Sequence, residues 1–142
     1  MVIPMKPLLT SVVLILALTG CATKPSSLYD QLGGKDNIAQ AVDYFIDGIA
    51  FDPQIYPYFA ETNIERFRNK MIEQLCFEAG GPCEYSGDSM EQVHAGMNVN
   101  EADFNRLVDL LVDAMTKAGI SHRAQNQLLA KLAPMRRDII YK

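Results

Sequence analysis

Apolar residues recur every three or four positions along the chain, and polar residues fill the gaps. This spacing places the apolar side chains on one face of an α-helix. In the stretch 36–50, for example, Ile38, Val42, Phe45 and Ile49 share such a face. No stretch alternates convincingly between apolar and polar residues in the way that predicts a β-strand. The pattern therefore predicts an all-α fold.

The predicted helices begin and end at recognisable signals. They cover residues 28–32, 36–50, 64–78, 89–95, 101–115 and 123–141, with a short turn at 53–59. Side chains that can cap a helix N-terminus stand at Ser27, Thr62, Asp88, Asn100 and Ser121, and Glu65 and Glu91 would complete capping boxes with Thr62 and Asp88. Pro134 lies inside the last predicted helix and should kink it, because proline has no amide proton to donate.

Composition narrows the class of protein. The 142 residues suffice for one domain, and 49% of them are apolar, which excludes a disordered acidic tail. Thirteen Lys and Arg residues against 17 Asp and Glu residues give a formal net charge of −4. A general nucleic-acid binder needs clustered positive charge, so no nucleic-acid partner is expected. Two histidines and three cysteines are too few for a module with several zinc ions.

Residues 1–20 have the pattern of an export signal rather than of a folded segment. Lys6 precedes an apolar run at 8–18 that is too short for a permanent membrane span. The run ends in Leu18-Thr19-Gly20-Cys21, which resembles the processing box of bacterial lipoproteins. Cleavage there would leave Cys21 at the new N-terminus, carrying diacylglycerol on its thiol. The alternative is an ordinary secreted protein with a chance cysteine.

The mature chain would then consist of an acylated tether, residues 21–27, and a domain, residues 28–142. The acyl chains would attach it firmly to a membrane on the periplasmic side. Ala22, rather than an aspartate, follows the cysteine and favours the outer membrane.

Two further cysteines flank a turn. Cys76 and Cys83 are seven positions apart, and Gly80-Gly81-Pro82 lies between them. Two such thiols in an exported protein are expected to be oxidised, which favours a structural disulfide. A buried free thiol at Cys76 and a redox pair are the alternatives.

His94 is the first candidate for metal chemistry. It lies on the short predicted helix 89–95, two positions before Gly96. A neutral imidazole there can ligate a metal through one ring nitrogen while the other donates to a nearby carbonyl. Taken alone, such a histidine is more often a surface or core residue. His122 stands beside a helix cap and is expected to face solvent.

A set of motifs occurs in a specific order along residues 28–140. The marks are Gly33-Gly34, Phe45, Tyr58-Phe59, Gly80-Gly81-Pro82, Tyr85-Ser86-Gly87, Val93-His94-Ala95-Gly96 and the segment 129–138. Together they resemble the group 1 truncated haemoglobins. The resemblance implies a truncated globin-like, two-over-two helical sandwich around one haem b (iron protoporphyrin IX).

The resemblance also implies roles for individual residues. His94 matches the proximal iron ligand, and Phe59 matches the phenylalanine that packs on a face of the porphyrin. Further apolar side chains would complete the walls of the haem pocket, and they suit an ordinary helical core equally well. They are Phe45, Phe67, Met71, Met90, Val93, Phe104, Leu111 and Met115.

The distal side departs from the family pattern. Ile46 stands where many members carry a tyrosine that donates a hydrogen bond to bound oxygen, and Phe67 and Met71 occupy two positions that often assist it. Lys70 matches a position from which some members bring a sixth ligand to the iron. A lysine can ligate only when it is deprotonated, so we expect Lys70 to reach toward a haem propionate instead.

The resemblance implies binding of O2, NO and CO. It also allows oxidation of NO to nitrate with an unidentified electron donor, or a role in redox or gas sensing. From a different class, a haem-less helical lipoprotein that acts as an interaction module is the alternative. The absorbance spectrum separates these hypotheses, because only a haem protein shows a Soret band that shifts with CO.

Overall fold

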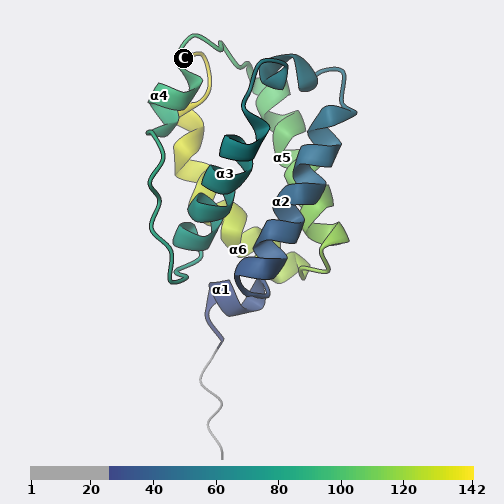
Figure 1. The fold of residues 1–142 in the computed structure, drawn as a ribbon, viewed down its shortest axis with the longest axis vertical. Coiled ribbons are helices and arrows are strands. Elements are labelled where there is room, and N and C mark those ends of the chain that lie inside the picture. The colour runs from purple at the N-terminus through teal and green to yellow at the C-terminus, as the bar shows by residue number, and fades with distance from the viewer. Residues whose placement is uncertain (1–25) are drawn as a thin grey trace, which may run out of the picture.

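The computed structural model describes residues 26–142, which fold into a bundle of helices (Figure 1). The α-helices are α1 (Leu28–Gln31), α2 (Gly34–Ala50), α3 (Ile64–Glu78), α4 (Met90–His94), α5 (Glu101–Lys117) and α6 (His122–Leu132). Two 3-10 helices, η1 (Tyr56–Phe59) and η2 (Ala133–Asp138), complete the fold. The all-α prediction is confirmed, since the β-type pairing within these residues is a single bridge between Val99 and Ile140. The predicted export signal, Cys21 and most of the tether lie outside the described residues.

The four long helices form two stacked pairs. Helix α2 packs against α3 and α5, and helix α6 also packs against both α3 and α5 (Figure 1). The face of α2 that the apolar spacing predicts is the face that is buried, and it meets the buried side chains of α5. Burying each large aliphatic side chain there contributes about 1.5–3 kcal/mol. No helix within residues 26–142 has the length and apolar character that a membrane crossing requires.

Helix α2 approaches α5 closely at Gly48. A side-chain carbon added at this glycine would lie 3.4 Å from Cδ2 of Leu110 on α5. Larger residues at position 48 would push the two helices apart, because Leu110 is itself buried. The small residue therefore keeps α2 and α5 in close contact.

Two helix caps differ from the sequence prediction by one residue. Asn63, not Thr62, caps α3, and its side-chain oxygen accepts from the amide of Arg66 at 2.9 Å. Ser89, not Asp88, caps α4 and forms a capping box with Gln92. Adjacent residues in both stretches can cap, and the path of the preceding loop decides between them. The caps predicted at Ser27, Asn100 and Ser121 are confirmed.

The last predicted helix is broken rather than kinked at Pro134. Helix α6 ends at Leu132, and the chain continues as the 3-10 helix η2 with Pro134 in its first turn. A proline ring clashes with the carbonyl four residues earlier, which ends an α-helix but suits the first turn of a new one. The break turns η2 toward α4, and the two short helices pack together.

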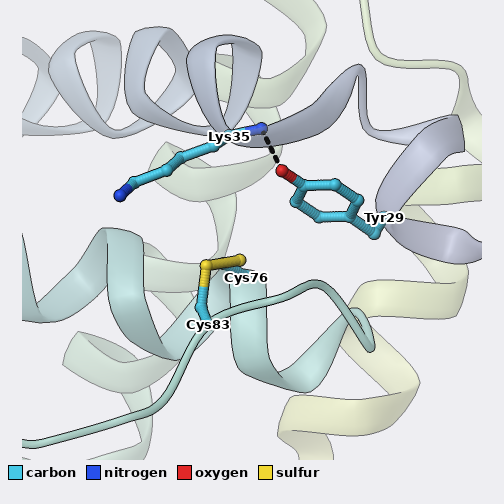
Figure 2. Close-up of a disulfide and its surroundings, with 4 residues drawn as sticks. All are labelled: Tyr29, Lys35, Cys76 and Cys83. Carbon is cyan, nitrogen blue, oxygen red and sulfur yellow. Dashed lines mark hydrogen bonds between the residues drawn. A yellow bond between two sulfur atoms is a disulfide. The ribbon is translucent and has the colours of Figure 1, made fainter.

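A disulfide closes the loop that leads to α4. Cys76 on α3 is joined to Cys83, with 5.9 Å between their Cα atoms (Figure 2). The Tyr29 ring lies beside this bridge, and its hydroxyl oxygen accepts a hydrogen bond from the amide of Lys35 at 3.0 Å. A side-chain carbon at Gly81 would stand 2.4 Å from the Tyr29 ring and 2.8 Å from Sγ of Cys76. Only glycine fits at this position.

We predict that reducing the disulfide lowers the free energy of unfolding by about 2–3 kcal/mol, the chain-entropy value for so short a loop. Urea unfolding with and without a reductant measures the difference. A Cys76→Ala/Cys83→Ala double variant is the control and should be insensitive to the reductant. Two thiols that alkylate without prior reduction, in protein purified without a reductant, would contradict the bridge.

Candidate functional site

A cavity of about 870 Å³ lies between α3, α4, α5 and the segment from α6 to η2. Its volume falls in the range of small-molecule and cofactor sites. Most of its wall consists of aromatic, aliphatic and thioether side chains, which exclude water from the interior. These include Phe45, Phe59, Phe67, Met71, Met90, Val93, Met97, Phe104, Leu107, Leu111 and Met135.

His94 presents a nitrogen ligand to this cavity. It is the last residue of α4 and is half-buried. Nδ1 lies 2.7 Å from the carbonyl oxygen of Met90. Because a carbonyl only accepts hydrogen bonds, Nδ1 carries the proton and Nε2 keeps a lone pair. Burial lowers the pKa of His94, so the neutral, ligating form of the ring is favoured.

The short helix α4 is held in place from both ends. At its start, the Ser89 and Gln92 side chains and backbone amides bond reciprocally. At its end, Gly96 adopts a φ of 81°, a conformation that favours glycine and turns the chain sharply. The next residues pair with the C-terminus, because the amide of Asn98 donates to the carbonyl of Lys142 at 2.9 Å. These contacts fix the direction of the His94 ring.

Three phenylalanines form one aromatic cluster on the wall. The ring centroids of Phe59 and Phe67 are 5.0 Å apart in an edge-to-face arrangement, and those of Phe45 and Phe67 are 6.4 Å apart. Both geometries are favourable for aromatic pairs. The cluster joins α2, η1 and α3 and provides a rigid apolar surface within the cavity.

Two neighbouring residues of α2 that were both expected at the pocket differ in their relation to the cavity. Phe45 lines the cavity, whereas Ile46 is not among the lining residues. Successive helical residues point about 100° apart, so an offset of one position moves a side chain off the wall. Ile46 is partly buried against the hydrophobic core, and its expected role on the distal side of the pocket stays a prediction.

The other predicted pocket residues do come together. Phe59, Phe67, Lys70, Met71, Met90, Val93, His94 and Phe104 all line the cavity. Leu111 lines it as well, while Met115 is buried in the core away from it. His122 is exposed and lies outside the cavity wall.

Lys70 is already engaged by two oxygen-bearing side chains. Its Nζ lies 2.9 Å from Oε2 of Glu73 and donates to Oγ of Ser86 at 2.6 Å. The ammonium of Lys70 and the Ser86 hydroxyl and amide lower the pKa of Glu73 to about 2. The resulting cluster ties α3 to the loop before α4.

Sequence reasoning missed several polar side chains on the wall. The Nε2 atom of Gln74 lies 3.4 Å from the sulfur atoms of both Met90 and Met135. The Tyr85 hydroxyl donates to the carbonyl oxygen of Asp88 at 2.8 Å. Tyr58 and Asp103 form a third pair. The residue types alone gave no signal for these contacts, and those of Gln74 and of Tyr58 with Asp103 join segments that meet only in the folded chain.

The fold and this donor set define a class of protein. A single neutral histidine on an apolar wall suits a metal that arrives inside an organic cofactor, because the cofactor supplies the other ligands. Cationic side chains on the wall, Arg66, Lys70 and Arg136, suit acidic groups on such a cofactor. The arrangement is that of a helical haem-binding bundle.

Comparison with known proteins identifies the family. The chain belongs to the Bacterial-like globin family, whose sequence profile matches residues 27–141. It is 32% identical to the group 1 truncated haemoglobin of Mycolicibacterium paratuberculosis, over 82% of this chain and 85% of that protein. It is 33% identical to the group 1 truncated haemoglobin of Nostoc sp., over 82% of this chain and 99% of that protein.

Solved structures support the same fold. The truncated haemoglobin of Tetrahymena pyriformis in its Fe(III) form matches with a TM-score of 0.79 and 24% identity, over 82% of this chain and 100% of that one. Membership in the globin family implies haem binding and the binding of diatomic gases such as O2. The haem-less interaction module is therefore not favoured.

Proposed function

We propose that this chain binds haem b in the 870 Å³ cavity, with His94 as the proximal iron ligand, and that it binds O2 and other diatomic gases. The observation that carries the proposal is the hydrogen bond from Nδ1 of His94 to the Met90 carbonyl. It holds the ring in the tautomer whose Nε2 can ligate a metal.

The residues around the cavity have separable roles in this proposal. Haem b would supply an iron atom that binds O2, NO or CO. Phe45, Phe59 and Phe67 exclude water from the cavity and pack on flat aromatic surfaces. Lys70 would contact an acidic group of the haem rather than the iron, because ligation of the iron would break its contacts with Glu73 and Ser86.

Replacing His94 by glycine should abolish stable haem uptake, because the Nε2 ligand is lost. The absorbance spectrum of protein expressed in haem-replete cells measures this as the disappearance of the Soret band, and added imidazole should restore part of it. His122→Gln is the matched control and should keep the wild-type spectrum. An unchanged ferrous spectrum in His94→Gly would show that another residue holds the iron.

Polar side chains on the wall bond to protein partners rather than to the cavity interior. Tyr58, Lys70, Gln74 and Tyr85 each donate to another residue. A diatomic ligand beside Phe45 would thus be surrounded mainly by apolar groups. This arrangement supports weak stabilisation of a polar ligand such as O2 relative to the less polar CO.

Introducing a donor at Phe45 tests this interpretation. Phe45→Tyr should slow O2 dissociation by about tenfold, because a hydrogen bond to a partly charged acceptor contributes about 1.5 kcal/mol. CO dissociation should change less. Stopped-flow or flash photolysis gives both rates, and Ile46→Tyr is the control because position 46 lies off the wall. A larger effect in Ile46→Tyr than in Phe45→Tyr would reverse the assignment of the wall.

We further propose that the chain is exported and acylated at Cys21, and the sequence motif at 18–21 supports this. The described domain begins only a few residues after this cysteine, so the haem-binding domain would lie near the periplasmic surface of a membrane. Mass spectrometry of membrane-extracted protein should show a diacylglyceryl adduct on Cys21. Cys21→Ser should lose this adduct, and an unmodified Cys21 in the exported protein would refute the anchor.

A further inference from the structure

A second, much smaller cavity of about 30 Å³ adjoins His94. Its ionisable lining residues are Tyr58 from η1, His94 from α4 and Asp103 from α5. The remaining wall is apolar: Ile55, Phe59, Met97, Val99, Leu107 and Ile139. His94 and Asp103 therefore border the same small space, whose apolar wall screens a charge only weakly.

Asp103 places a buried carboxylate at this cavity. The residue is 9% exposed and lies in the first turn of α5. Its Oδ2 accepts a hydrogen bond from the Tyr58 hydroxyl at 2.5 Å, and its Oδ1 accepts one from Nε2 of Gln54 at 2.8 Å. Asp103 forms none of the ion pairs found within residues 26–142. Its charge is therefore moderated by neutral donors.

The protonation states of this pair are well separated. The hydrogen bonds from Tyr58 and Gln54 hold the pKa of the Asp103 carboxyl below its usual range, so it is ionised at neutral pH. The same contact raises the pKa of Tyr58 to about 12, so the hydroxyl keeps its proton and stays a donor. Arg106, on the same helix, pairs instead with Asp52, at 2.7 Å.

We propose that Asp103 and Tyr58 set the reduction potential of the haem iron. The Asp103 carboxylate lowers this potential from the small cavity that it shares with His94. The Tyr58 hydroxyl limits the effect by donating a hydrogen bond to the carboxylate. A buried negative charge stabilises the ferric state, because that state carries one more positive charge than the ferrous state. The inference rests on the proposed ligation of haem by His94.

The pair also has a structural role, which the test must separate from the electrostatic one. The Tyr58–Asp103 hydrogen bond ties η1, which carries Phe59, to α5. Breaking it from either side should loosen the same contact and admit water in the same way. The electrostatic role predicts different reduction potentials for the two substitutions. Replacing Asp103 removes the charge, whereas removing the Tyr58 hydroxyl leaves the charge in place and less shielded.

The experiment compares Asp103→Asn with Tyr58→Phe in the haem-loaded full chain. Spectroelectrochemical titration measures the one-electron midpoint potential of each variant. Asp103→Asn should shift the equilibrium about tenfold toward the ferrous form, a change of about 59 mV for one electron. Tyr58→Phe should leave the potential unchanged or lower it. Asp109→Asn removes an exposed charge from the same helix and should stay close to wild type, because water screens that charge.

Several results would overturn the proposal. An equal rise in Asp103→Asn and Tyr58→Phe would assign both effects to loosened packing, and no shift in Asp103→Asn would show that the iron does not sense this charge. If Asp103→Asn fails to fold, Gln54→Leu removes the other donor and keeps the charge, so a raised potential there contradicts the proposal. A wild-type chain that takes up no haem would refute the proposed function itself, whereas a haem-loaded chain with unmoved potentials refutes only this inference.

Discussion

The packing of α2 between α3 and α5 is the contact on which the rest of the structure depends. One face of α2 is buried along its length, and Gly48 allows α5 to approach closely. Phe45, on that same face, is 2% exposed and also lines the cavity. The core and the cavity therefore share a wall. Since α2 positions both α3 and α5, it also positions the side chains that these helices contribute to the cavity.

His94, the proposed iron ligand, lies on a helix that would not be stable by itself. A helix as short as α4, Met90–His94, is unstable in isolation, because the cost of forming its first turn is not recovered over so few residues. Its stability comes from its surroundings. The disulfide and the cluster around Lys70 hold the loop before it, and η2 and the C-terminal residues hold the chain after it. The position of His94 therefore depends on parts of the chain that lie far from α4 in the sequence.

Much of the fold could be predicted from local sequence patterns. The bounds 64–78 agree with α3, and apolar spacing located the buried face of α2, because amphipathic periodicity reports burial directly. The predictions that were wrong concern positions where two local signals compete. Thr62 and Asn63 are both good caps, and Pro134 could have kinked the last helix or ended it. Tertiary contacts decide such cases, and a single sequence does not show them.

The apolar wall of the candidate site could be predicted from the sequence to a greater extent than its polar contacts. Family motifs placed His94 and Phe59 on the cavity wall, and apolar spacing placed Phe45 there as well. The polar contacts were not predictable, because Tyr58 and Asp103 are 45 residues apart in the chain and no spacing rule links them. An apolar wall needs only residues of suitable size, whereas a buried charge needs each partner at a defined distance. A polar pair of this kind therefore becomes visible only in the folded chain.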